Sequence, residues 1–172
     1  MLEGEKINIR PLRRGDLEWF ADWNNDSEYK GPYEPLEENT LEEIEKWFDS
    51  EKTTESWVIT DKQGNPVGQI ITGPQGDYYW LGYILHPDYR GRGYTTEAVK
   101  LLVTHLFRTK DIVRVQAECS PENKASVRVL EKAGFTYEGL KRKAVFVQGR
   151  YLDGALYSVL REEWVNQGKV NP

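Results

Sequence analysis

The spacing of apolar residues near the N-terminus predicts one strand followed by two helices. Residues 7–12 alternate apolar and polar side chains, which is typical of a half-buried strand. Asp16 is placed to cap a helix whose apolar positions fall on one face: Leu17, Phe20 and Ala21. Thr40 and Glu43 form a capping box before a second helix, which is expected to bury Leu41, Ile44 and Phe48. Both helices precede the main sheet.

The remaining pattern predicts a sheet with helices between its strands. Residues 56–60 and 66–71, separated by a polar turn, are expected to form a hairpin. Residues 78–86 are nearly all apolar, so this strand is expected in the middle of the sheet with both faces buried. Further elements follow in order: a helix over 94–107, a strand over 112–117, a helix over 123–133 that ends at Gly134, and strands over 135–147 and 151–160. We see no repeat or linker, and expect a single domain over residues 1–172.

Composition supports an ordinary globular domain. The 172 residues are 38% hydrophobic and 30% charged. There is no signal-peptide pattern, and no apolar run approaches the roughly 20 residues that span a bilayer, so we expect a cytoplasmic protein without membrane contact. The single cysteine, Cys119, is expected to be a buried free thiol. With only two histidines, no metal site is expected.

Charge is distributed unevenly along the chain. Residues 16–55 carry fourteen Asp and Glu against three Lys, whereas residues 86–150 carry thirteen Lys and Arg against seven acids. The basic half suits a polyanion such as a phosphorylated cofactor, and the acidic half either faces a cationic acceptor or is a solvated surface. The net charge of −5 and the absence of interleaved basic and aromatic residues argue against nucleic-acid binding.

The most informative motif is a glycine turn between a buried strand and a helix. Gly91 and Gly93 allow a tight turn with inward-pointing N–H groups, to which the following helix adds its unpaired donors and positive end. Such a turn suits a pyrophosphate, although a plain strand-to-helix turn has the same residues. No Lys-Ser or Lys-Thr pair follows, which excludes a P-loop. Thr96 stands where a dinucleotide fingerprint needs Gly or Ala.

These residues resemble the signature of the GNAT superfamily of N-acetyltransferases: Arg or Gln, two residues, Gly, one residue, then Gly or Ala. Arg90 and Gly93 match it, and Thr95 departs from it at the last position. Matches along the whole chain look like the RimJ/RimL branch: Arg10-Pro11-Leu12 with Asp16, Gly82-Tyr83 before His86-Pro87, Thr96-Glu97-Ala98, Asn123 with Ser126, residues 131–135 and residues 160–164.

The resemblance implies an α/β (mixed α+β) fold, with a strongly twisted mixed sheet of about six to seven strands and about four helices. The strands at 78–86 and 112–117 would splay apart to admit acetyl-CoA. By the same resemblance, the residues that hold it would be the backbone of Ile84, Leu85 and His86, the amides of Arg90, Gly91, Arg92, Gly93, Tyr94 and Thr95, and the side chains of Asn123 and Ser126. Lys132 ends a basic stripe with Lys124 and Arg128, which lies either near the cofactor's phosphates or in solvent.

Catalysis needs a proton acceptor and a proton donor. At pH 7 only about one lysine-like amine in two thousand is uncharged. The glutamate that many family members carry on the central strand is Trp80 here, and a common tyrosine is Leu130. A base acting through water, or an amine partly deprotonated in an apolar pocket, remains. The resemblance to RimL-like enzymes implies Ser126 as the catalytic acid; a small residue that lets the helix approach coenzyme A is the alternative.

The acceptor site and the activity are also expectations at this stage. Tyr29 and Tyr33, in a Gly/Pro-rich loop, are expected to line the acceptor pocket, whereas His86 and Glu97 are expected to be structural. The resemblance implies acetyl transfer from acetyl-CoA to a primary amine, either a protein N-terminus or a small molecule. The alternative is a non-catalytic module that binds acyl-CoA, because the usual glutamate and tyrosine are missing. A monomer or a homodimer is expected.

Overall fold

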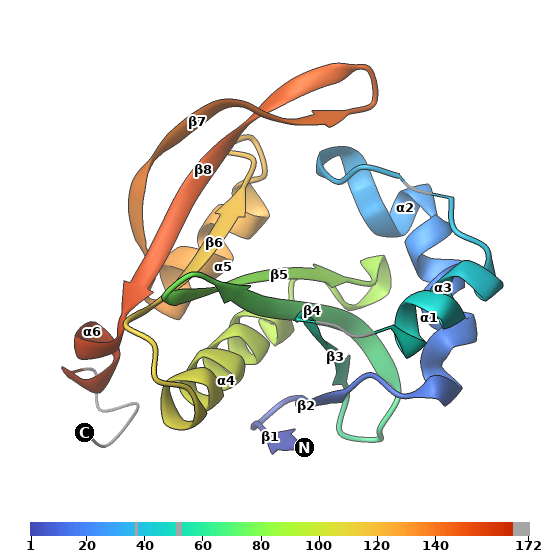
Figure 1. The fold of residues 1–172 in the computed structure, drawn as a ribbon, viewed down its shortest axis with the longest axis horizontal. Helices are drawn as coiled ribbons and strands as arrows, with labels where there is room; N and C mark the ends of the chain where they lie inside the picture. Colours follow the sequence, from blue (N-terminus) through green and yellow to red (C-terminus); the bar gives the residue numbers. More distant parts are fainter. Residues whose placement is uncertain (37, 51–52, 167–172) are drawn as a thin grey trace.

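The computed structural model describes residues 1–36, 38–50 and 53–166, and its centre is a mixed sheet in the order β1-β2-β3-β4-β5-β6-β8-β7 (Figure 1). The strands are β1 (Leu2–Glu3), β2 (Asn8–Pro11), β3 (Glu55–Thr60), β4 (Pro66–Gln75), β5 (Tyr78–Leu85), β6 (Arg114–Cys119), β7 (Thr136–Val147) and β8 (Arg150–Leu160). The family's mixed sheet is confirmed. Its eight strands exceed the expected six to seven because β1, with two residues, is too short to show an alternating pattern.

The helices surround this sheet. They are α1 (Leu17–Asn25), α2 (Ser27–Lys30), α3 (Leu41–Asp49), α4 (Tyr94–Thr109), α5 (Lys124–Ala133) and α6 (Arg161–Asn166), with 3-10 turns η1 (Arg14–Asp16), η2 (Gly31–Tyr33) and η3 (Pro87–Tyr89). The four helices expected from the sequence are α1, α3, α4 and α5. The two others, α2 and α6, have four and six residues, which is too short for a helical period to stand out. In Figure 1, α4 runs below β4 and β5, and α1 to α3 gather at the right.

Helix α4 supplies much of the main core. One face of it is fully apolar, and its buried side chains are Ala98, Val99, Leu102, Val103, Leu106 and Phe107. They pack with strand residues such as Ile9 and Ile70, and Trp164 of α6 belongs to the same cluster. Burying a side chain of this size contributes about 1.5–3 kcal/mol, so this face fixes α4, and with it the turn that precedes it, against the sheet.

The N-terminal helices form a second, smaller core with β3. Thr40 and Glu43 make the expected capping box: the Thr40 hydroxyl accepts from the Glu43 amide at 3.2 Å, and the Glu43 carboxylate accepts from the Thr40 amide at 2.8 Å. Ile44 is buried as expected, but the expectation for Leu41 is wrong, since it remains 40% exposed. The second core covers the middle of α3 and not its first turn.

Asp16 does not cap α1, contrary to expectation. Its carboxylate accepts two hydrogen bonds from the Arg10 guanidinium, at 2.7 and 2.8 Å, and one from the Arg13 amide at 2.8 Å. The η1 turn precedes α1, and Asp16 itself has helical backbone angles, so no side-chain cap bond forms. The carboxylate instead ties the end of β2 to the start of α1.

The sheet opens between its two central parallel strands. β5 and β6 are paired only at Tyr79–Val115, Trp80–Gln116 and Leu81–Ala117. Beyond these pairs β5 runs on to Leu85 and β6 to Cys119 without further pairing between them, while their outer edges stay paired with β4 and β8. The divergence expected for the strands at 78–86 and 112–117 is confirmed, and it creates the site described next.

Candidate active site

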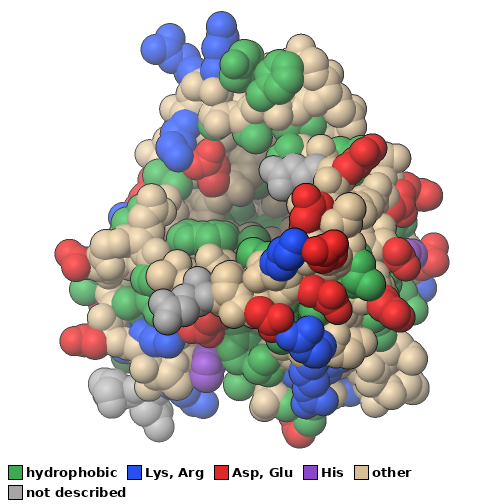
Figure 2. Space-filling view, turned by 45° about the vertical axis from the view of Figure 1, so that its right-hand side comes forward, with side chains coloured by type: hydrophobic (Ala, Val, Ile, Leu, Met, Phe, Trp, Pro, Cys, Tyr) green, Lys and Arg blue, Asp and Glu red, His purple; other side chains and the backbone are tan. Residues whose placement is uncertain are grey.

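A cleft of about 1140 Å³ occupies the opening between β5 and β6. It appears as the hollow near the centre of Figure 2. Its walls include eight of the residues expected to bind the cofactor or the acceptor: Tyr29, Tyr33, Ile84, Leu85, Arg90, Thr95, Asn123 and Ser126. His86, residues 91–93 of the glycine turn and Tyr94 are sequence neighbours of these residues and are not among those that line the cleft. Lys132 is exposed in the last turn of α5 and does not line the cleft.

The glycine turn has the shape of an anion cradle. Gly91 and Gly93 have φ of +77° and +82°, a conformation that side chains other than glycine rarely adopt. α4 begins directly after Gly93, so its first amides have no acceptor within the helix. A Cβ added at Gly91 would meet nothing within 4 Å, and one added at Gly93 would meet only the Lys6 ammonium at 3.9 Å. The space above the turn is therefore open for a phosphate group.

The two arginines of the turn hold its backbone in place. The Arg90 guanidinium donates to the carbonyls of Leu85 and Tyr29, each at 3.0 Å, and so joins the end of β5 to α2. Arg92 donates to the Asp88 carbonyl at 2.9 Å and lies over the Tyr89 ring. Both guanidinium groups bind carbonyls, which leaves backbone amides as the donors that this turn offers to an anion.

Lys6 is a cation beside the turn that sequence reasoning missed. Its ammonium forms no ion pair with any described residue. Its backbone is held by Glu97 in the first turn of α4, whose carboxylate accepts from the amides of Glu5 and Lys6. Glu97 thus has the expected structural role, but it secures the turn before β2. Lys6 lies far from the glycines in the chain, and no local pattern signals this proximity.

Two hydroxyl groups meet across the cleft. The Tyr83 hydroxyl on β5 lies 2.9 Å from the Ser126 hydroxyl on α5 and 3.2 Å from the Ser126 carbonyl. Asn123 accepts from the Ser126 amide at 3.1 Å and so caps α5. Burial raises the pKa of Tyr83, with the hydrogen bond to Ser126 opposing it. Tyr83 is therefore protonated at neutral pH. The sequence places it in a buried strand and carries no signal that it meets Ser126.

Cys119, at the end of β6, also lines the cleft. It is a free cysteine and is half-buried, not fully buried as expected. Burial raises the pKa of its thiol. A thiol that stays protonated is a poor nucleophile, so the position does not support covalent catalysis.

The aromatic residues at the end of β5 form a tight cluster. Tyr29 is fully buried, with its ring against Trp23, and its hydroxyl has no hydrogen-bond partner among the described residues. The His86 ring also packs on Trp23, at 4.8 Å between centroids, and its Nδ1 accepts from the Asp88 amide. Tyr33 differs from both, because its hydroxyl donates to the Glu122 carbonyl at 3.3 Å and so joins η2 to the loop before α5.

Other kinds of site are not found in the described residues. No group of three or more His, Cys, Asp and Glu side chains in this part of the chain is placed to hold a metal ion. None of the helices described combines the length and apolar character that crossing a bilayer requires.

Comparisons with known proteins agree with this geometry. The pattern of the acetyltransferase (GNAT) domain family matches residues 6–136. A probable N-acetyltransferase of Bacillus subtilis, YjcK, is 29% identical, with 95% of this chain and 98% of that protein covered.

Two solved structures share the fold. Spermidine N-acetyltransferase of Vibrio cholerae, in complex with CoA and spermine, has a TM-score of 0.82 at 22% identity and covers 95% of this chain and 100% of its own. RimL, a ribosomal L7/L12 acetyltransferase in complex with coenzyme A, has a TM-score of 0.80 at 19% identity, with 91% and 95% covered. The family pattern spans more than half of the chain and coincides with the glycine turn and the divergent strands, so the protein belongs to the GNAT acetyltransferase family.

Proposed function

We propose that this protein transfers the acetyl group of acetyl-CoA to a primary amine of a small cationic acceptor. The observation that carries this proposal is the cleft itself. It runs from the glycine turn, which suits a pyrophosphate, past the open edges of β5 and β6 to the paired hydroxyls of Tyr83 and Ser126. A phosphate site and a proton donor within one cavity are what acyl transfer from coenzyme A requires.

The residues present fit coenzyme A. The pyrophosphate binds to the amides of residues 90–95, with the Lys6 ammonium nearby. The unpaired inner edge of β5 at Ile84 and Leu85 offers backbone groups to the pantetheine amides, as a neighbouring strand would. The Asn123 carbonyl oxygen is used in capping α5, which leaves its NH₂ group to donate to the pantetheine arm.

Acid catalysis is assigned to the hydroxyl pair. When the thioester breaks, the sulfur leaves as a thiolate and takes a proton from Ser126, which in turn is replenished by the buried Tyr83 hydroxyl 2.9 Å away. This hydroxyl pair supplies the proton donor that is missing at Leu130, where many family members have a tyrosine. It also favours catalysis over the alternative of a non-catalytic binding module.

The acceptor side of the cleft is acidic. Glu34 and Glu43 line it, and Figure 2 shows acidic side chains gathered to the right of the hollow. Clustered carboxylates attract a polycation and slow the approach of an anion. A relative 24% identical over 95% of this chain is a spermidine N(1)-acetyltransferase of Vibrio cholerae, which supports a polyamine as the first acceptor to test. Protein N-termini, suggested by RimL, remain in the test panel.

The test is thiol release from acetyl-CoA in the presence of polyamines, aminosugars, aminoglycosides and N-terminal peptides of ribosomal proteins. We expect release that depends on one class of amine and an acetylated product of that amine by mass spectrometry. Cofactor binding by calorimetry with no release on any amine would instead support the non-catalytic module. Sedimentation of the same preparation distinguishes a monomer from a homodimer.

A further inference from the structure

Among the described residues, three carboxylates line the cleft, and two of them are engaged. Glu43 takes part in the capping box of α3 with Thr40, and Glu118 forms an ion pair with Lys141 at 2.6 Å. Glu34, which directly follows η2, has neither a hydrogen bond nor an ion pair with any described residue. An unengaged carboxylate in the wall of a reaction cavity is free to bind or to accept a proton.

We propose that Glu34 is the general base that removes the proton from the acceptor ammonium group. This inference rests on the proposed acetyl transfer, and it supplies the base that the sequence lacks at Trp80 on the central strand. A proton acceptor that acts directly or through one water must share the cavity with the reacting atoms, and Glu34 lines the same cleft as Ser126 and Tyr83.

The electrostatic surroundings agree with this role. Solvent reaches Glu34, yet the protein atoms around it desolvate the carboxylate and raise its pKa, while the charge of Lys30 opposes the shift. Burial is the main cause that raises the pKa of Tyr83 and of Cys119, and the negative charge of Glu34 adds to both. Glu34 is therefore within electrostatic reach of the residues at the reaction centre, and it is a stronger base than a carboxylate in water.

No cation in the described part of the chain neutralises Glu34 in an ion pair. Lys30 of α2 donates to the Asn24 side chain at 3.5 Å, and Arg90 donates to backbone carbonyls. Lys141 of β7 is paired with Glu118 of β6. The other titratable groups that face the cavity are Tyr83 of β5, Cys119 of β6, Glu43 of α3, and the tyrosines Tyr29, Tyr33 and Tyr78. The cavity near Glu34 therefore offers one ammonium group both free volume and an uncompensated negative charge.

The reaction balances as follows. The Glu34 carboxylate accepts one proton from the ammonium, and the free nitrogen attacks the thioester carbonyl carbon to form the C–N bond. The nitrogen loses its second proton as the C–S bond breaks, and the electron pair of that bond goes to sulfur. The thiolate takes a proton from Ser126, which Tyr83 replenishes. The second proton from the nitrogen passes through water to Tyr83 and restores the pair, while Glu34 returns its own proton to solvent. Each turnover yields the acetylated amine, the coenzyme thiol and one released proton.

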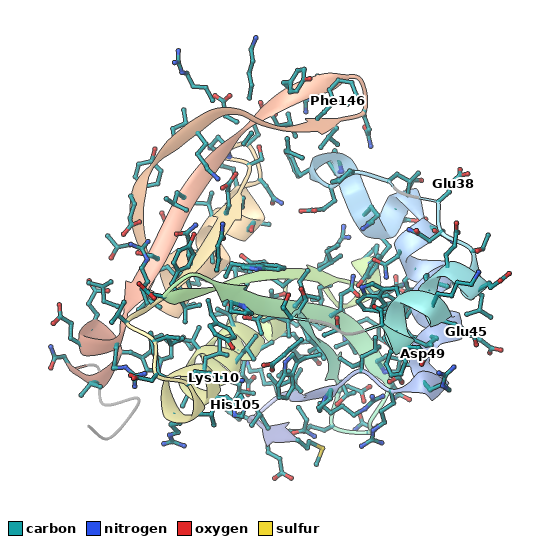
Figure 3. The ribbon with its side chains drawn as sticks, viewed as in Figure 1. Glu38, Glu45, Asp49, His105, Lys110 and Phe146 are labelled. Carbon is teal, nitrogen blue, oxygen red and sulfur yellow. The ribbon has the colours of Figure 1, made fainter. Side chains whose placement is uncertain are left out.

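The test compares Glu34→Gln with wild type and with Glu38→Gln across pH 6 to 10, using the acceptor that emerges from the panel. Glu38 is a matched control because it is exposed, belongs to the same segment and points away from the cleft in Figure 3. We expect Glu34→Gln to lower kcat about 10²-fold at pH 7, and this loss should shrink as pH rises and the amine deprotonates unaided. Affinity for coenzyme A should be unchanged, and Glu38→Gln should behave as wild type. Added acetate or formate should partly restore a Glu34→Ala variant.

Two results would overturn the assignment. One is a Glu34→Gln enzyme with the kcat and pH profile of wild type. The other is a rise in KM alone, with kcat unaltered at every pH, which would make Glu34 a binding residue for the cation. A wild-type enzyme that is inactive on every amine refutes the proposed function itself. Retained coenzyme binding shows that a slow Glu34 variant is folded, so a folding defect is distinguished from a lost base.

Discussion

At the scale of single residues, the proton donation that we propose for this cleft depends on two side chains from opposite walls. Ser126 comes from α5 and Tyr83 from β5, and neither hydroxyl can take over the role of the other. Leu130, at the position where many family members carry a tyrosine, is only 1% exposed and belongs to the main core. In our proposal, the tyrosine that supplies a proton therefore lies on the strand and not on the helix.

We predict that Ser126→Ala lowers kcat about 10²-fold, because the departing thiolate then lacks its nearest proton donor. Tyr83→Phe should lower kcat as well, and the double variant should be no slower than the slower single variant, since the two groups act as one unit. Steady-state thiol release measures all three enzymes. A Ser126→Ala enzyme with near-normal turnover would return the proton donation to water and leave Ser126 as a spacer beneath coenzyme A.

Asn123→Asp is the control for these variants. A carboxylate oxygen still caps α5 at the Ser126 amide, but the side chain loses the NH₂ donor. Cofactor affinity should fall with little change in kcat. Asn123→Ala would be a poorer control, because loss of the cap also costs roughly 1 kcal/mol of stability.

The residues of the site were predictable only where a local motif carries them. The glycine turn follows from residues a few positions apart, whereas Asn123 and Ser126 were expected from the family resemblance. The roles that we propose for Lys6, Glu34 and Tyr83 depend on where the fold brings them: beside Gly93, in the cleft wall and against Ser126. Periodicity assigns such residues to a strand or a loop, and it contains no information about which side chain lies opposite.

At the scale of elements, the same distinction separates the two N-terminal helices. The capping box of α3 is closed by two residues three positions apart, so the sequence predicts it correctly. At the start of α1, the Asp16 carboxylate could either cap the helix amides or pair with Arg10, and it forms a bidentate ion pair with the Arg10 guanidinium. A charged partner on the preceding strand outweighs the local preference for a cap.

Asp16→Asn should destabilise the protein by roughly 1–3 kcal/mol at pH 7, because it leaves the largely buried Arg10 without its counter-charge. Burial alone would raise the pKa of Asp16, but the Arg10 and Arg13 donors lower it below the ordinary value of 3.8. The ion pair therefore stabilises the fold above that pH, and its contribution is lost as pH falls toward the lower, folded pKa.

Urea denaturation of wild type and Asp16→Asn measures this difference. The gap between their free energies of unfolding should be largest near pH 7 and should narrow below pH 4. A gap that stays constant down to pH 3 would contradict an ionic origin. Glu45→Gln is a suitable control, since its side chain is exposed and its separation from Arg14 is 4.0 Å, so little change is expected.

At the scale of the whole molecule, the order of the strands was beyond prediction. The last two strands, expected over 135–147 and 151–160, are β7 and β8, which pair with each other, and β8 lies inside, between β6 and β7. The burial of the two strands agrees with this order: β8 buries Leu152, Ala155 and Val159, whereas β7 is mostly exposed, with Phe146 near the tip of the β7–β8 hairpin in Figure 3. The divergence of β5 and β6 was expected only from the family resemblance, because hydrophobic periodicity does not show where two neighbouring strands fail to pair.

Because the inner edges of β5 and β6 are unpaired, binding of the cofactor between them should be coupled to the stability of the sheet. A ligand that bridges both edges binds the folded state and not the unfolded chain, so it should raise the melting temperature in proportion to the logarithm of its concentration. At 100 times Kd the gain is about 2.7 kcal/mol. Calorimetric scans with increasing acetyl-CoA should show this rise. Gly93→Val, which forces a side chain into a backbone conformation with φ of +82° and fills the phosphate space, should abolish this rise in melting temperature.

Amide hydrogen exchange should slow at residues 82–85 and 118–119 as acetyl-CoA is added. The enzyme would then be least rigid in these strand ends when no cofactor is bound.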